Sequence, residues 1–278
     1  MLRSTFLAIL LCASCVAGAW ASEPRVPVFW DAKERLVKPD MTTLERLRFL
    51  TTTDFPPFNF IDGTGRLSGF HIDLARAICA ELESAGKCQI QAVPWSELDG
   101  ALRSGQGEAI IAGIAVTAEA RKRYAFSRPY LQFPGRFIMP RTMAVTEPNV
   151  EKMQGKRIGV MAGSGHERML RAYFSDVRVV TYTKQEWLYA DLKASKIAAA
   201  FGDGMRLAFW LAGSEAGGCC RFAGGPYLAP EYLGAGLAIA AQADNPQLAA
   251  AFDYALHQIS VKGIFGELYL RYFPVSFF

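Results

Sequence analysis

The chain is poor in the residues on which most metal sites and catalytic centres depend. It has three histidines, His71, His166 and His257, spread widely along its 278 residues. The four cysteines beyond residue 21 form no CxxC motif, a spacing typical of tetrahedral zinc sites. No histidine has a cysteine or carboxylate partner that the spacing makes evident. We therefore predict no metal site, no cofactor and no catalytic residue.

The chain also lacks a large excess of either positive or negative charge. Thirty basic residues are balanced by 26 acidic residues, which gives a net charge of +4 at pH 7. The two signs are mixed along the chain, whereas domains that bind nucleic acid gather their positive charge in one region. We therefore expect no nucleic-acid partner.

An apolar run near the N-terminus, Phe6–Leu11, is too short to cross a membrane. It follows Arg3 and leads to small residues that end at Ala21, an order typical of a secretory signal peptide. The sequence thus predicts a signal peptide over residues 1–21, cleavage near Ala21 and export to the periplasm. Neither Cys12 nor Cys15 has the flanking residues of a lipid-attachment site, so we expect a soluble exported protein.

Four cysteines remain beyond the signal peptide, and export permits disulfides. Cys79 lies near the end of a predicted helix and Cys88 begins the next predicted strand, so the two can come within disulfide reach. We predict a Cys79–Cys88 disulfide. Cys219 and Cys220 are neighbours, which can join only through a strained eight-membered ring, and the sequence leaves their state open.

Short strand-like runs alternate with helical patterns from Leu47 onward. The predicted strands are Arg48–Thr52, Gln89–Val93, Ala109–Ala115, Lys156–Met161, Arg178–Tyr182, Ile197–Phe201 and Leu237–Ala241. The predicted helices are Ile72–Glu83, Ser96–Ser104, Ala118–Arg123, Gly165–Phe174, Glu186–Ser195, Met205–Ala212 and Pro246–Val261, with a final helical piece that ends at Phe273. This alternation predicts an α/β protein with mostly parallel sheets flanked by helices.

The predicted elements form two sets, and a strand and helices are left over at the C-terminus. We therefore expect a chain that enters a second lobe and returns to the first, with a hinge at each of its two crossings. The predicted boundaries are residues 22–46 for an N-terminal extension packed by Val28, Phe29 and Trp30, residues 47–131 and 232–278 for lobe 1, and residues 132–231 for lobe 2. Glycines and prolines crowd residues 213–236, which predicts an irregular segment.

An aromatic loop follows the first predicted strand. Phe55, Phe58 and Phe60 lie around two adjacent prolines there. Loops that leave the carboxyl ends of strands in α/β sheets commonly hold small ligands. These rings are therefore candidates for a ligand floor, and the alternative is that all three belong to the core.

Four blocks of sequence carry a family resemblance. They are PPFNF…GxLxGFxIDLxxAI at 56–78, W-x-x-L…AL-x-SG…I-x-AG-x-x-x-T…R-x-x-FSRPY at 95–130, GKRIGV-x-AGSGHE at 155–167 and LKASKIAAAFGD at 192–203. In this order they resemble the family-3 extracellular solute-binding proteins, and the likeness runs from about Arg48 to Phe273. The resemblance implies a two-lobed type II periplasmic binding-protein fold and an amino-acid receptor that serves an ABC transporter.

The resemblance implies aromatic walls for the ligand. Phe55 stands at the family's aromatic position before the prolines, and Trp95 stands at the next one. Together they could enclose a flat or aliphatic side chain or offer a cation–π face. The alternative is again a place in the core for both rings.

Donors for a ligand carboxylate are expected where the second lobe's first helix begins. Ser164 and Glu167 form an S-x-x-E capping box. The free N–H groups of Gly165 and His166 would point at an anion, and the helix dipole would favour it. Ser164 could also act only as a cap. We expect His166 at the edge of the cleft.

The second block departs from the family's pattern. Gly113 and Thr117 match it, whereas Ala115 replaces the usual serine or threonine. The resemblance implies an arginine that binds the ligand carboxylate three residues after the threonine. That position is Ala120 here, and Arg121 lies one place later. One residue turns a helix by about 100°, so Arg121 reaches the cleft only if the loop shifts; otherwise it lies on a solvated face.

Asp203 is the candidate partner for a ligand ammonium group. It ends a predicted strand, and the resemblance places it where the family carries its amine-binding aspartate. The alternative is that it caps the helix that follows.

The leading hypothesis is a periplasmic protein that captures an amino-acid-like solute or another small organic anion between two lobes. It would act as a monomer and deliver the solute to the membrane permease of an ABC transporter. The alternatives are an exported accessory or sensory binding module, and an enzyme such as a dehydratase, which this fold occasionally hosts. The enzyme would need an acid–base constellation that the sequence does not supply.

Overall fold

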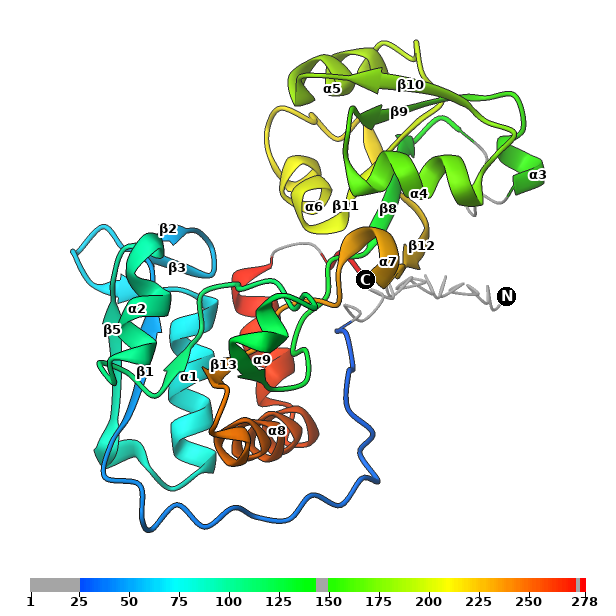
Figure 1. Ribbon diagram of the computed structural model, residues 1–278. Coiled ribbons are helices and arrows are strands. Elements are labelled where there is room, and N and C mark those ends of the chain that lie inside the picture. The colour runs from blue at the N-terminus through cyan, green and yellow to red at the C-terminus, as the bar shows by residue number, and fades with distance from the viewer. Residues whose placement is uncertain (1–25, 144–149, 274–275) are drawn as a thin grey trace, which may run out of the picture.

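The computed structural model describes residues 26–143, 150–273 and 276–278. The chain forms two lobes and crosses between them twice (Figure 1). The two-lobed α/β architecture that the sequence predicts is confirmed. The predicted signal peptide and its cleavage site lie outside the described residues.

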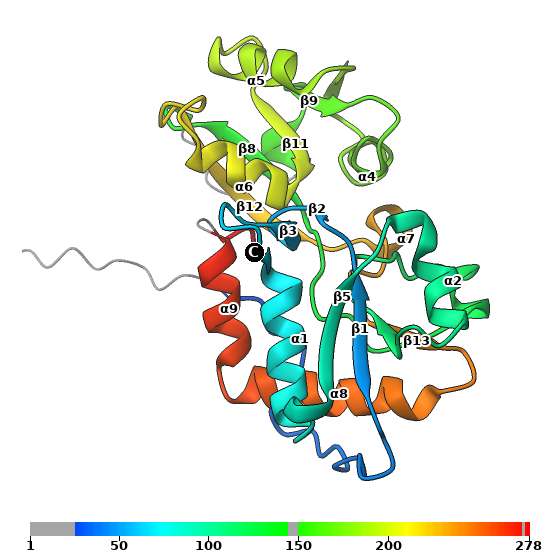
Figure 2. The same cartoon turned by 90° about the vertical axis from the view of Figure 1, so that its left-hand side faces the viewer.

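The first lobe is built on a five-stranded sheet. In spatial order its strands are β5 (Cys88–Ala92), β1 (Leu47–Thr51), β6 (Ala109–Ile110), β13 (Ala240–Gln242) and β7 (Tyr124–Phe126). Its helices are α1 (Phe70–Glu81), α2 (Leu98–Arg103), α8 (Pro246–Val261) and α9 (Ile264–Tyr272), with short 3-10 turns η1 (Ala85–Lys87), η2 (Trp95–Glu97) and η3 (Ala120–Lys122). A small separate sheet holds β2 (Asp54–Phe55), β3 (Asn59–Ile61) and β4 (Leu67–Ser68). Figure 2 shows this small sheet at the end of the lobe that faces the second lobe.

The second lobe repeats the plan. In spatial order its strands are β10 (Arg178–Tyr182), β9 (Arg157–Met161), β11 (Ala199–Asp203), β8 (Gly135–Pro140) and β12 (Cys220–Tyr227). Its helices are α3 (Val150–Met153), α4 (Gly165–Tyr173), α5 (Gln185–Lys193), α6 (Gly204–Ala212) and α7 (Pro230–Leu233).

Each large sheet is mixed, with a parallel and an antiparallel half. β1 runs parallel to both β5 and β6, and β9 runs parallel to both β10 and β11. β13 pairs antiparallel with β6 and β7, and β8 pairs antiparallel with β11 and β12. The predicted alternation of strands and helices describes the parallel halves. The antiparallel halves arise from strands at the two crossings, which helix–strand alternation does not reveal.

Helix α1 shows why these residues take this fold. Leu74, Ala75 and Ile78 are buried on one face, as expected when apolar residues recur at intervals of three and four. Gly69 precedes the helix with φ of +129°, and a Cβ there would collide with the carbonyl oxygen of Phe58. Only glycine fits this junction between β4 and α1.

The N-terminal extension passes round the end of lobe 1 that lies away from lobe 2 (Figure 1). Trp30 is buried, and the guanidinium of Arg128 lies 5.1 Å from its ring centroid. Arg128 donates two hydrogen bonds of 2.7 Å to Glu34. Phe29 packs partly against the core. Val28, which the sequence analysis placed with them, is 75% exposed, so that part of the prediction was wrong.

Two disulfides are present among the described residues. Cys79, on α1, joins Cys88, on the adjacent strand β5, with a Cα–Cα distance of 6.1 Å, as predicted. Cys219 joins its neighbour Cys220 at the start of β12, with a Cα–Cα distance of 3.7 Å. The sequence left the state of this second pair open.

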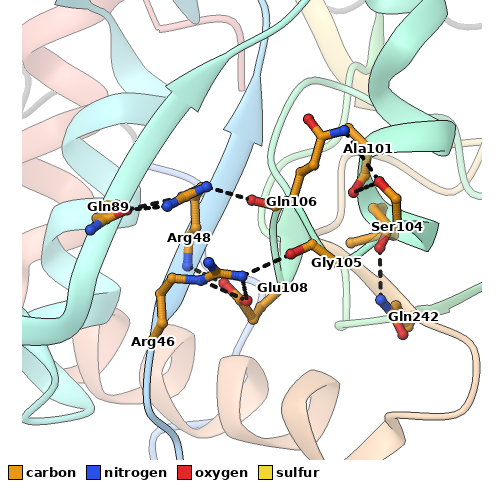
Figure 3. A network of polar contacts seen from close by, with 10 residues as sticks. Arg46, Arg48, Gln89, Ala101, Ser104, Gly105, Gln106, Glu108 and Gln242 are labelled. Carbon is orange, nitrogen blue, oxygen red and sulfur yellow. Dashed lines mark hydrogen bonds and ion pairs between the residues drawn. The ribbon is translucent and has the colours of Figure 1, made fainter.

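A polar network fixes the amino end of β1 (Figure 3). Arg46 pairs with Glu108 at 2.8 Å, and the backbone N–H of Arg48 donates to the same carboxylate at 2.6 Å. Arg48 also donates to Gln89 on β5 and to the carbonyl of Gln106. These contacts hold β1, β5 and the turn before β6 in register, which leaves the carboxyl ends of the strands for ligand contacts.

Candidate functional site

The N-terminus of α4 forms one side of a cavity in lobe 2. Ser164 is its N-cap, and its hydroxyl oxygen accepts a 3.0 Å hydrogen bond from the N–H of Glu167. The carboxylate of Glu167 accepts from the N–H of Gly163 at 2.8 Å, which is the chief cause of its lowered pKa, with Arg171 next. The predicted capping box is therefore present, with its return bond shifted by one residue. The first N–H groups of α4 have no partner inside the helix.

Gly165 allows a second helix to approach this turn. A Cβ at Gly165 would collide with the carbonyl oxygen of Tyr232 in α7. α7 belongs to the segment that leads back to lobe 1. The turn that was predicted to hold an anion therefore contacts the returning crossing directly.

Asp203 ends β11 and lies at the N-terminus of α6. One carboxylate oxygen accepts a 2.8 Å hydrogen bond from the N–H of Arg206, so Asp203 caps α6. A helix cap and a ligand contact were the alternatives for Asp203, and the cap uses one of its two carboxylate oxygens. The next residue, Gly204, donates to the carbonyl of Pro134 in the first crossing, which ties this turn to the hinge.

Ser164, His166 and Asp203 meet at one cavity of about 410 Å³. Arg206 and Gln185 add polar groups to its wall. Its remaining lining is Met161, Leu188, Phe201, Gly202 and Leu207. The cavity thus offers a carboxylate, a guanidinium, a hydroxyl and a ring nitrogen above an apolar floor, a combination suited to a small charged solute.

His166 has a polar atom without a partner. Its Nε2 is buried and forms no hydrogen bond within the described part of the chain. Burial lowers the pKa of His166, and the nearby carboxylate of Asp203 opposes this effect. A ligand that donates a hydrogen bond to this nitrogen would relieve the cost of leaving it unsatisfied.

Phe55 and Gly113 come together in lobe 1. The Phe55 ring stacks on Phe58 with centroids 4.6 Å apart. A Cβ at Gly113 would lie 2.9 Å from the Phe55 ring, so this glycine makes room for it. Phe58 is fully buried, whereas Phe55 and Phe60 keep part of their surface exposed. Phe58 therefore belongs to the core, and Phe55 remains a candidate wall.

Trp95 lies in η2 with 55% of its surface exposed. It lines a second cavity, of about 360 Å³, in lobe 1. The other residues of that cavity are Thr52, Thr53, Asp54, Ala92, Val93 and Pro94. The ring is therefore available to a ligand and is not part of the core.

Three residues of the second sequence block, which departs from the family's pattern, lie outside both cavities. Ala115 forms an isolated bridge with Leu237, and the Thr117 hydroxyl accepts from the N–H of Ala120 at 3.0 Å. Arg121 is exposed, with its guanidinium 6.0 Å from the ring of Phe126. None of Ala115, Thr117 and Arg121 lines the lobe-2 cavity or the Trp95 cavity.

Sequence reasoning missed Arg206 and Gln185. Arg206 follows Asp203 by three residues on α6, so helix geometry alone could have placed the two on one face. Gln185 begins α5 and carries no motif. Its place in the cavity depends on how α4, α5 and α6 converge.

The described residues hold no group of three or more histidine, cysteine or acidic side chains that could bind a metal ion. Within the same part of the chain, no helix combines the length and apolar character needed to cross a membrane.

Comparison with known proteins identifies the family. The family model of bacterial extracellular solute-binding proteins, family 3, matches residues 47–275. The chain is 28% identical over 234 residues to the lysine/arginine/ornithine-binding periplasmic protein of Escherichia coli K12, covering 84% of this chain and 89% of the relative. It is 28% identical over 230 residues to ABC transporter arginine-binding protein 1 of the same organism, covering 83% and 91%.

A solved structure shows the same fold. The unliganded open form of the L-cystine solute receptor of Neisseria gonorrhoeae superposes with a TM-score of 0.71 at 15% identity, covering 84% of this chain and 94% of the receptor. The type II periplasmic binding-protein fold is thereby confirmed. The two Escherichia coli relatives are both described as binding proteins. The chain belongs to the bacterial extracellular solute-binding proteins of family 3, whose members bind amino acids for ABC transporters.

Proposed function

We propose that this protein captures a small amino-acid-like solute between its lobes in the periplasm and delivers it to the permease of an ABC transporter. The observation that carries the proposal is the lobe-2 cavity, in which Asp203 and the start of α4 present opposite electrostatic poles. An amino acid has an ammonium and a carboxylate, which need such partners in a site with apolar walls.

The position of these groups supports a role for closure. The α6 turn that holds Asp203 bonds to the first crossing at Pro134, and the α4 turn contacts the returning segment at Tyr232. Phe55 and Trp95 lie on the other lobe. A solute that contacts both lobes favours the closed state, because only that state makes all the contacts. The permease would then receive the closed form.

A thermal-shift screen tests the proposal. The mature protein is mixed with each standard L-amino acid and with small organic acids. A ligand at about a hundred times its Kd adds about 2.7 kcal/mol to the free energy of unfolding. For a chain of this size that raises Tm by roughly 5–10 °C. Failure of every amino acid and every organic acid to raise Tm would contradict the proposal.

A further inference from the structure

Two side chains of opposite charge lie on the first turn of α6. Asp203 and Arg206 both line the lobe-2 cavity. The backbone N–H of Arg206 donates to Asp203 at 2.8 Å, which fixes the spacing of the two residues. Their head groups form no ion pair with each other within 4.0 Å, so each charge remains available to a third partner.

The guanidinium of Arg206 has no acidic partner among residues 26–143, 150–273 and 276–278. This distinguishes it from Arg171 and Arg128, which are held by Glu167 and Glu34. An exposed arginine can simply be solvated. At Arg206, however, the side chain borders a cavity that also contains a buried, unpartnered nitrogen on His166. That second observation indicates that a ligand completes the site.

The chemistry of the cavity matches a zwitterion. A carboxylate suits an ammonium group, and a guanidinium suits a carboxylate because its planar fork can donate two parallel hydrogen bonds. Leu188, Phe201 and Leu207 also line the cavity, and apolar surroundings strengthen interactions between charges. The start of α4 adds partial positive charge on the side of Ser164.

We propose that Arg206 binds the α-carboxylate of the solute, beside the ammonium partner already expected at Asp203, so that lobe 2 alone recognises the zwitterionic head. The inference rests on the proposed function and names the residue that selects the carboxylate. The side chain of the solute is then directed toward Phe55 and Trp95 of lobe 1. Arg121, which lies one place after the position of the family's carboxylate-binding arginine, has its guanidinium beside Phe126.

The inference is tested by a double-mutant-type cycle that removes the negative charge of the ligand carboxylate and the positive charge of Arg206, separately and together. The probes are the standard amino acid with the largest thermal shift and its α-carboxamide, which lacks the negative charge. Their affinities are measured by calorimetry for the wild type and for the Arg206→Ala variant. We expect Arg206→Ala to weaken the acid by about 10- to 100-fold and to change the carboxamide by less than about 3-fold. Arg206→Lys, which keeps the charge but loses the fork, should lie between.

Arg121→Ala is the matched control, and it should weaken both probes equally or not at all. An equal loss for acid and carboxamide in Arg206→Ala would overturn the inference, as would a selective loss of the acid in Arg121→Ala. In either case binding by the wild type leaves the proposed function intact. If the wild type binds an organic acid but no amino acid, the inference fails and the proposed function stands. If it binds neither an amino acid nor an organic acid in the screen, both fail.

Discussion

Replacing Asp203 with asparagine is expected to abolish the ligand-induced thermal shift without unfolding the protein. Asparagine caps a helix about as well as aspartate, so the hydrogen bond from the N–H of Arg206 is preserved. The charge is lost, and removing one partner of a desolvated charge pair costs about 2 kcal/mol or more. If binding weakens about 100-fold, the stabilisation at the same ligand concentration falls from about 2.7 to about 0.4 kcal/mol.

A second capped helix supplies the control. Asn245 caps α8 by accepting a 3.1 Å hydrogen bond from the N–H of Leu248. Asn245→Ala should lose about 1 kcal/mol of stability and keep the full ligand shift. Asp203→Ala should lose both. An unchanged shift in Asp203→Asn would reject the counter-ion role and leave Asp203 as a helix cap only.

Lowering the pH from 8 to 5 is expected to destabilise the protein through His71. This side chain is fully buried, and burial lowers its pKa to about 3. An exposed histidine in the unfolded chain has a pKa of about 6.5. Below about pH 6.5 the unfolded state binds a proton at His71, whereas the folded state does not. The free energy of unfolding therefore falls by about 1.4 kcal/mol per pH unit, or about 2 kcal/mol at pH 5.

The contacts of His71 explain why it stays neutral. Asn59 donates to Thr52 at 2.7 Å, so its side-chain oxygen faces His71 Nδ1 and accepts from it at 2.7 Å. His71 Nε2 then accepts from the hydroxyl of Tyr130 at 2.8 Å. Both ring nitrogens therefore form hydrogen bonds in the neutral form. A proton on Nε2 would point at the Tyr130 hydroxyl, which is the donor of that hydrogen bond. The network also links Thr52, which lines the Trp95 cavity, to Tyr130 beside the first crossing.

Chemical denaturation across this pH range measures the effect. His71→Gln should remove the His71 part of the slope, because glutamine does not titrate. His166, whose pKa burial also lowers, keeps its own part. Histidine-labelled NMR of the wild type gives an independent reading, in which the His71 ring should remain neutral at pH 5. A ring that protonates near pH 6.5, or a slope as steep in a folded His71→Gln variant as in the wild type, would contradict the account.

The sequence revealed most of the fold wherever periodicity and end signals coincided. The predicted helix 246–261 is identical to α8, because Asn245 supplies a cap, Pro246 suits the first turn and Gly263 follows the end. The strand 178–182 was also predicted correctly. β12 was missed, because Gly224, Gly225 and a proline stand in its middle and the register shifts there. Such residues usually indicate a loop.

The candidate site was only partly predictable. Ser164 and Asp203 end or begin regular elements, so local signals found them. Arg206 was missed because its spacing from Asp203 places the two on one helix face but does not show that this face borders a cavity. Its relevance appears only when α4 and α6 are placed around one cavity. The one-residue offset of Arg121 was noticed from the sequence, but the direction of its side chain depends on the turn η3.

Small-angle scattering with and without ligand tests the central claim most directly. The amino acid with the largest thermal shift is added at a saturating concentration to the mature protein. If the lobes close on the solute, the radius of gyration decreases, and it stays unchanged in Asp203→Asn. A wild-type protein that is saturated by calorimetry yet keeps the radius of gyration of the ligand-free form would contradict capture by closure.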